Sequence, residues 1–196
     1  MALALSTTAP EDDVSTRPSG EREAASVPTT WEELYEQHFD FVWRSLRRLG
    51  VPASALDDAA QEVFLVAFRR LSDFEARSTL KTWLFGIAWN IARRASRLER
   101  RREEPLSDDA FSAATNQEEV ASRAEAVRTL YEILNELEPE KRAVFVMAEL
   151  EEMTAPEIAE ITGVPLNTVY SRLRGARTDF DAALGRRRAR DEWRRP

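Results

Sequence analysis

Polar side chains between residues 167 and 178 have the chemistry needed to read the edges of nucleic-acid bases. They are Asn167, Ser171, Arg174 and Thr178, which share a helical face with Gly175. No acidic residue falls between positions 167 and 178, whereas a helix face that is only solvated usually carries Glu and Lys pairs. Amide, hydroxyl and guanidinium groups match the donors and acceptors of the major groove. The pattern therefore predicts a DNA-reading surface.

The neighbouring residues predict the two helices that position this surface. Thr154 and Glu157 have the spacing of a capping box, and Gly163 can supply the conformation that ends a short first helix. The second helix carries an apolar stripe that consists of Val169, Leu173, Ala176, Phe180 and Leu184. Spacing alone fits an ordinary helical hairpin equally well. The acid-free outer face favours a helix-turn-helix whose second helix enters the major groove.

A second candidate surface lies on the long helix expected after the loop at residues 72–77. Its outward face combines aromatic, hydroxyl and basic side chains, namely Thr82, Phe85, Trp89, Arg93, Ser96 and Arg100. Such a face can stack unpaired bases while the guanidinium groups hold the phosphate backbone. The alternative is that Phe85 and Trp89 pack against a neighbouring helix and that only the arginines are exposed. Helical periodicity does not separate these two interpretations.

A third surface belongs to the helix expected at residues 54–71. Its far side carries Asp58, Gln61, Glu62, Leu65 and Arg69. An apolar centre surrounded by polar side chains is typical of a docking site for a protein partner. A single exposed leucine is equally ordinary on a protein surface. Both interpretations stay open at this point.

The composition of the chain argues against most catalytic chemistries. The 196 residues carry a formal net charge of -7 and include no cysteine and one histidine. We therefore expect no thiol nucleophile, no Cys/His zinc site and no cofactor. His38 and Asp40 are the one conceivable acid/base pair, but positions i and i+2 do not share a helix face, so an enzyme is the least favoured class. No stretch is apolar enough for membrane insertion, and we expect a cytoplasmic protein.

The order of the segments predicts an all-α protein with two small helical domains joined by an acidic flexible linker. Gly185 is expected to end the last helix. The basic residues beyond it either bind the phosphate backbone of DNA or are only solvated. The expected boundaries are a disordered tail at 1–29, a first domain at 30–102, a linker at 103–121, a second domain at 122–185 and a basic tail at 186–196.

Six motifs occur in the order and spacing found in the extracytoplasmic-function (ECF) sigma factors, which the chain resembles over about residues 31–184. These compact bacterial initiation subunits keep only sigma region 2 and sigma region 4. The region 2 motifs are LRRLG at 46–50, DDAAQEVFLVAF at 57–68 and TWLFGIAWNIARR at 82–94. The region 4 motifs are LNELEPEKRAVF at 134–145, EIAEITGVP at 157–165 and NTVYSRLRGAR at 167–177.

The resemblance implies partners and three sets of site residues. The expected partners are core RNA polymerase, through its largest-subunit clamp and its flap, then promoter DNA and an anti-sigma factor. The set for the clamp is Asp57, Asp58, Gln61, Glu62 and Leu65. The set for the minus-10 element, which includes the aromatic and basic face, is Phe74, Arg77, Ser78, Thr79, Leu80, Phe85, Trp89, Asn90, Arg93 and Arg97. The set for the minus-35 element is Asn167, Thr168, Tyr170, Ser171, Arg172, Arg174, Gly175 and Arg177.

Two other classes of protein stay as alternatives. A one-component regulator would use the helix-turn-helix alone, but duplex reading needs no stacking platform of the kind expected at Phe85 and Trp89. A helical adaptor that binds no DNA is disfavoured by the acid-free face and by the clusters of arginine. Reconstitution with core polymerase separates these classes from a sigma factor.

Overall fold

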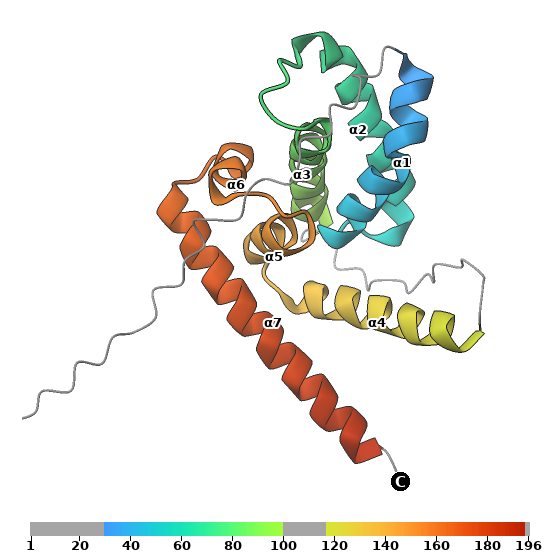
Figure 1. The fold of residues 1–196 in the computed structure, drawn as a ribbon, viewed down its shortest axis with the longest axis vertical. Coiled ribbons are helices and arrows are strands. Elements are labelled where there is room, and N and C mark those ends of the chain that lie inside the picture. The colour runs from blue at the N-terminus through green and yellow to red at the C-terminus, as the bar shows by residue number, and fades with distance from the viewer. Residues whose placement is uncertain (1–29, 100–116, 195–196) are drawn as a thin grey trace, which may run out of the picture.

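The computed structural model describes residues 30–99 and 117–194, which form helices and no strands (Figure 1). The first unit contains α1 (Trp31–Arg48), α2 (Leu56–Arg70) and α3 (Leu80–Glu99). The second contains α4 (Gln117–Glu136), α5 (Pro139–Phe145), α6 (Ala155–Thr162) and α7 (Leu166–Arg194). Short helical turns at Ala53–Ala55, Leu71–Asp73 and Val146–Leu150 connect them. The predicted all-α fold with two helical domains is confirmed.

Side-chain caps mark the beginnings of α1 and α3. Thr30 accepts a hydrogen bond from the backbone N–H of Glu33 at 3.2 Å, and Thr79 accepts one from Thr82 at 3.1 Å. Each cap satisfies a donor that the first turn of a helix leaves unpaired. Gly50 has a φ of 90° just after α1, a conformation that disfavours any residue with a Cβ.

The core of the first unit lies between its three helices. The apolar side chains with no exposed surface are Leu34, Val42 and Leu46 of α1, Ala60, Val63, Phe64 and Ala67 of α2, and Leu84, Phe85 and Ala88 of α3. The ring of Trp31 packs edge-on against Phe64 and Phe68, with centroids 6.1 and 5.6 Å apart. Burying each large apolar side chain contributes about 1.5–3 kcal/mol to folding.

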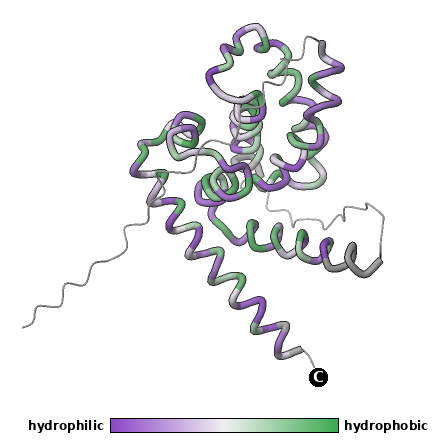
Figure 2. Tube along the Cα trace, viewed as in Figure 1, coloured by the Kyte–Doolittle hydropathy of each residue, from purple (hydrophilic) through white to green (hydrophobic). Residues whose placement is uncertain are grey.

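The second unit contains the predicted capping box and turn. The backbone N–H of Thr154 donates to the Glu157 carboxylate at 2.8 Å, and Gly163 adopts a φ of 68° between α6 and α7. α7 then buries Val169, Leu173 and Ala176 against the rest of the unit. Figure 2 shows hydrophilic residues along the length of α7, interrupted by single hydrophobic positions.

The predicted end of α7 at Gly185 is wrong, because the helix continues to Arg194. Two ion pairs hold this extension against α4, one between Arg186 and Glu136 at 2.6 Å and one between Arg187 and Glu132. A glycine inside a helix costs about 0.5–1 kcal/mol relative to alanine, a penalty that these flanking contacts offset. The basic segment after Gly185 is therefore a helical extension, not a loose tail.

α4 begins at Gln117, so residues 117–121 of the predicted linker are helical. The remainder of that linker and the predicted N-terminal tail lie outside the described residues. The two units touch each other, and one continuous apolar cluster includes Trp89 of the first unit together with Phe145 and Ile158 of the second. α6 lies beside α3 (Figure 1).

Candidate nucleic-acid interface

The outer face of α7 is open in the structure. Asn167, Tyr170, Ser171 and Arg174 are exposed, while Val169 and Leu173 on the opposite side are buried. This is the arrangement that the apolar stripe of the sequence predicts. The hydroxyl of Ser171 donates to the carbonyl of Thr168 at 3.0 Å, so its oxygen can still accept hydrogen bonds from a ligand. Thr168 and Arg172, at the sides of this face, are half-buried.

Arg174 is the cation best placed for base contact on this face. Its side chain is exposed, and within residues 30–99 and 117–194 it forms no ion pair with a carboxylate. A guanidinium group has five donors in a planar fork that matches the O6 and N7 acceptors of guanine. The fork is therefore available to a ligand without first breaking an internal contact.

Gly175 and Arg177 occupy a different side of α7. A Cβ at Gly175 would lie 3.3 Å from Cε of Lys141, so the glycine faces α5 and the prediction that it lies on the outer face is wrong. Lys141 donates to Asp179 at 2.7 Å, and that hydrogen bond raises the pKa of the lysine. Arg177 pairs with Glu149 at 2.7 Å. Both positions are engaged within the second unit.

The predicted stacking platform on α3 is also wrong. Phe85 has no exposed surface and Trp89 is 6% exposed, so neither ring can stack on a base. α3 is packed against α1, α2 and α6, which covers both of its apolar sides. The alternative interpretation, in which Phe85 and Trp89 pack against a neighbouring helix, is correct for these two rings, although Lys81 and Asn90 are exposed on α3 as well as arginines. Asn90 and Arg93 are exposed, and the side chain of Arg97 lies outside the described part.

A shallow groove between α2 and α3 contains positions that the sequence interpretation missed. Its volume is about 340 Å³, and its lining consists of Val66, Arg69, Arg70, Ile87, Asn90, Ile91 and Arg94. Arg94 of α3, one of these lining residues, pairs with Glu62 of α2 at 2.6 Å. Arg69 and Arg70 are exposed at the end of α2, and their adjacency in the sequence is a signal that could have identified them.

The loop before α3 places the remaining predicted minus-10 residues near one another. The ring of Phe74 lies 5.4 Å from that of Trp83, and Arg77 pairs with Glu75 at 2.5 Å. Ser78 and Leu80 are half-buried, and Thr79 is exposed. The loop therefore presents a partly covered aromatic ring beside hydroxyl groups and an exposed arginine.

The acidic face of α2 is exposed around an apolar centre. Asp58 and Gln61 are exposed, and Leu65 is 44% exposed. Asp57 accepts a hydrogen bond from the indole N–H of Trp43 at 3.2 Å. Phe68 is 48% exposed one turn beyond Leu65, which the i, i+3 spacing could have indicated. Two neighbouring exposed apolar side chains, Leu65 and Phe68, favour the interpretation as a docking surface over that of one ordinary exposed leucine.

His38 is a packed residue of α1. It is 8% exposed, and its burial, together with the charge of Lys81, lowers the pKa of its imidazole. A neutral buried ring is consistent with a structural role. No helix in the described ranges is long and apolar enough to cross a membrane.

Comparison with known proteins identifies both units. Residues 34–102 match the family model of sigma-70 region 2, and residues 128–179 match that of sigma-70 region 4. The ECF RNA polymerase sigma-E factor of Escherichia coli K12 is 30% identical over 142 residues, which cover 67% of this chain and 74% of that protein.

Two solved structures have the same fold. CnrH, a sigma factor of Cupriavidus metallidurans, was solved with the cytosolic domain of CnrY; it shares 26% identity and a TM-score of 0.57, and the match covers 79% of this chain and 87% of that one. RpoE of Bartonella quintana, solved with the anti-sigma factor NepR, shares 18% identity and a TM-score of 0.64 over 79% and 96% of the two chains. The chain therefore belongs to the ECF sigma factors, which direct core RNA polymerase to promoters.

Proposed function

We propose that each of the three exposed surfaces binds one of the partners of a sigma factor. The α7 face of Asn167, Tyr170, Ser171 and Arg174 reads the minus-35 element. The loop before α3 and the groove between α2 and α3 bind the minus-10 element. The α2 face of Asp58, Gln61 and Leu65 docks on the clamp of the polymerase. The observation that carries this proposal is the open, acid-free face of α7 opposite a buried stripe.

The chain itself performs no catalysis on this proposal, because the polymerase supplies the chemistry of RNA synthesis. The acts of the sigma factor are binding and orientation, and they take place in the cytoplasm with the chromosomal DNA. A protein partner that restrains it is a further part of the proposal, supported by the complex of the similar CnrH with the cytosolic domain of CnrY. The flap of the polymerase is the expected contact of the second unit.

Run-off transcription with bacterial core polymerase on genomic fragments tests the proposed function. The wild-type chain should produce discrete transcripts that core polymerase alone does not produce. Asp58→Lys should weaken association with core polymerase by about tenfold, about 1.4 kcal/mol, because it reverses an exposed charge at the docking face. The helical fold should be unchanged by circular dichroism.

Asp40→Lys is the matched control, because it makes the same charge change at an exposed position of α1. It should leave core association within about twofold of wild type, since the residue lies outside the docking face. Equal losses in both variants would show that net charge, and not the α2 face, determines binding. Transcription by core polymerase that does not change when the chain is added would reject the proposed function as a whole.

A further inference from the structure

The loop before α3, residues 74–79, contains a residue in a backbone conformation that its side chain disfavours. Ala76 has a φ of 54°, in the left-handed region, although it is not a glycine. Among residues 30–99 and 117–194, Glu152 is the other non-glycine residue with a positive φ. A Cβ in this region crowds the following carbonyl oxygen, so such residues are uncommon and persist only where their surroundings hold them. The conformation of Ala76 therefore requires a physical cause.

The loop is fixed at both of its ends. At its start, the ring of Phe74 packs on the ring of Trp83 in α3, with centroids 5.4 Å apart. At its end, the hydroxyl of Thr79 accepts a hydrogen bond from the backbone N–H of Thr82 and lies 2.8 Å from the hydroxyl of that residue. Residues 75–78 must span the distance between these two anchors. A short span between fixed ends can hold one residue in a conformation that it would not adopt alone.

The effect of Ala76 on the loop comes from its backbone. Its side chain is a single exposed methyl group. The polar groups belong to its two neighbours, and Oε2 of Glu75 lies 2.5 Å from Nη2 of Arg77. Positions i and i+2 do not face each other on a helix, so this contact depends on the non-helical path of the chain at Ala76. The left-handed residue therefore determines where the guanidinium of Arg77 lies.

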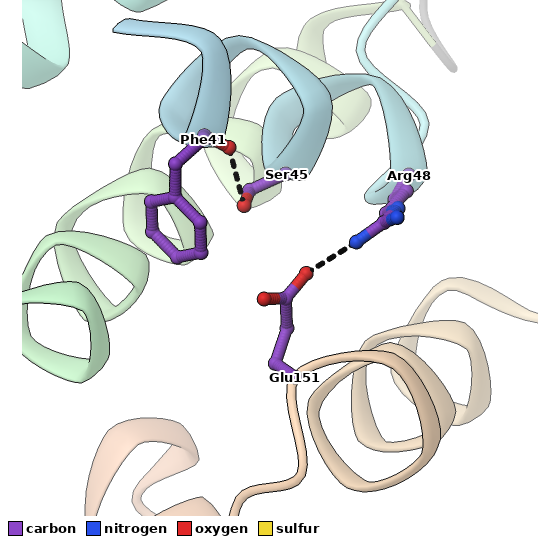
Figure 3. A network of polar contacts seen from close by, with 4 residues as sticks. All are labelled: Phe41, Ser45, Arg48 and Glu151. Carbon is purple, nitrogen blue, oxygen red and sulfur yellow. Dashed lines mark hydrogen bonds and ion pairs between the residues drawn. The ribbon is translucent and has the colours of Figure 1, made fainter. Parts of the chain in front are cut away.

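The pair of Glu75 and Arg77 is open to solvent. The side chain of Arg77 is 82% exposed and that of Glu75 is 62% exposed. The pair of Arg48 and Glu151 is different, because its side chains are only 24% and 11% exposed (Figure 3). An ion pair in water contributes little to stability, whereas breaking a buried pair leaves a charge uncompensated. A DNA phosphate or base can therefore replace Glu75 as the partner of Arg77.

An arginine that is already placed is a better ligand for DNA than a freely rotating one. Its planar guanidinium has five donors, which match phosphate oxygens and the acceptor edges of bases. Immobilising a long side chain or a loop at the moment of binding reduces affinity. In this chain the disfavoured conformation of Ala76 is adopted when the first unit folds. The free energy of DNA binding is then not reduced by ordering the loop.

We propose that Ala76 is a positioning residue, whose left-handed backbone holds Arg77 in the orientation in which it binds minus-10 DNA. The inference rests on the proposed function, which assigns the minus-10 element to this loop. It goes beyond that function because Ala76 acts through the placement of Arg77 and needs no contact of its own with DNA.

The test measures binding of holoenzyme to a promoter fragment that gives a discrete transcript in the run-off assay. The minus-10 segment of the fragment is opened in advance by mismatches, and the minus-35 element is left out to limit the contribution of the second unit. Ala76→Val introduces a β-branched residue that rarely adopts a positive φ, and Ala76→Pro fixes φ at about −65°. Both variants should bind the fragment about tenfold more weakly, because few molecules keep the competent loop.

Two further variants change the side chain and keep the backbone. Ala76→Asn and Ala76→Gly both leave the left-handed region accessible. They should bind the fragment within about threefold of wild type. Ala124→Val is the matched control, because it makes the same substitution as Ala76→Val at an exposed position inside α4. It should leave binding within about twofold of wild type.

A double-variant cycle tests whether Ala76 acts through Arg77. Arg77→Ala should weaken binding to the opened fragment by about tenfold, because it removes a charged donor. Adding Ala76→Val to Arg77→Ala should then weaken binding by less than about twofold more, whereas independent sites would lose a further tenfold. Glu75→Gln should bind at least as well as wild type, because it removes a carboxylate that competes with DNA and leaves the backbone at Ala76 unchanged.

Two measurements separate positioning from a general structural role. The nuclear Overhauser effect between the amide proton and Hα of residue 76 is strong when φ is positive, because the two protons are then close together. It should be strong in the free wild-type chain and in Ala76→Asn, and weak in Ala76→Val. The affinity of Ala76→Val for core polymerase should equal that of wild type, since the docking face of Asp58 and Leu65 lies outside the loop.

Wild-type affinity of Ala76→Pro for the fragment would overturn the inference. Equal losses in the asparagine, glycine and valine variants would also overturn it, because the side chain and not the backbone would then matter. A further tenfold loss on top of Arg77→Ala, or a loss of core affinity in Ala76→Val, would overturn action through Arg77. Failure of wild-type holoenzyme to distinguish the fragment from one with a scrambled minus-10 segment would instead reject the proposed function. The nuclear Overhauser effect at residue 76 is measured without DNA and does not depend on that outcome.

Discussion

α3 and α7 carry similar side chains and have opposite surroundings. Each helix has an apolar stripe and, away from it, arginines and small polar groups. α3 lies between α1, α2 and α6, so Phe85 and Trp89 are buried (Figure 1). α7 contacts α4, α5 and α6 on one side, and its face of Asn167, Ser171 and Arg174 remains open. The number of neighbours around a helix, and not its own pattern, decides which polar face can meet a ligand.

The largest expected effect concerns the buried side of α3. Trp89→Ala should lower the free energy of unfolding by about 3–5 kcal/mol, because it removes a packed indole and leaves a cavity. Chemical denaturation followed by circular dichroism measures this change. Trp193→Ala is the matched control on α7, since Trp193 is 87% exposed, and it should change stability by less than about 0.5 kcal/mol. Similar losses at the two tryptophans would remove the contrast between the helices.

The next effect concerns the open face of α7. Arg174→Ala should cost about 1–3 kcal/mol in binding of holoenzyme to its own promoter and relax the preference at one base pair. Stability should hardly change. Arg188→Ala, an exposed position of the helical extension, should weaken all sequences alike and reduce the salt dependence, because it can only neutralise phosphate. The measurement uses matched and single-base-substituted promoter DNA across a salt series.

Uniform weakening by Arg174→Ala would make this arginine a phosphate contact and would move the reading face elsewhere on α7. Arg186 and Arg187 are unsuitable as controls, because they pair with Glu136 and Glu132 of α4. Their loss would disturb the extension as well as any contact with DNA.

The sequence predicted local structure well because the signals are local. The capping residues Thr30 and Thr154, the turn at Gly163 and the buried stripe of α7 each depend on neighbours within a few residues. Burial of Phe85 and Trp89 depends on helices distant in the sequence, α6 among them, so periodicity along α3 could not show it. The partnership of Arg48 with Glu151, 103 positions apart, has no local signal at all.

The continuation of α7 through Gly185 has the same cause. A glycine followed by a basic run is a normal signal for the end of a helix. The helix continues because Glu132 and Glu136 of α4 form ion pairs with Arg187 and Arg186, and the sequence around Gly185 does not show these contacts. The interpretation of the site failed in the same way at Gly175, whose neighbour Lys141 comes from α5.

The smallest expected effect compares a packed and an open glycine within α7 itself. Gly185 has nothing within 4 Å of the position of a Cβ, so Gly185→Ala should raise the free energy of unfolding by about 0.5–1 kcal/mol through the greater helix propensity of alanine. At Gly175 the new Cβ would lie 3.3 Å from Cε of Lys141, whose Nζ is held by Asp179 at 2.7 Å. That lysine must shift, and its displacement offsets the gain in propensity. Gly175→Ala should therefore be less favourable than Gly185→Ala in the same denaturation experiment. Equal stabilisation by both changes would mean that Lys141 moves freely and that this side of α7 is as open as the reading face.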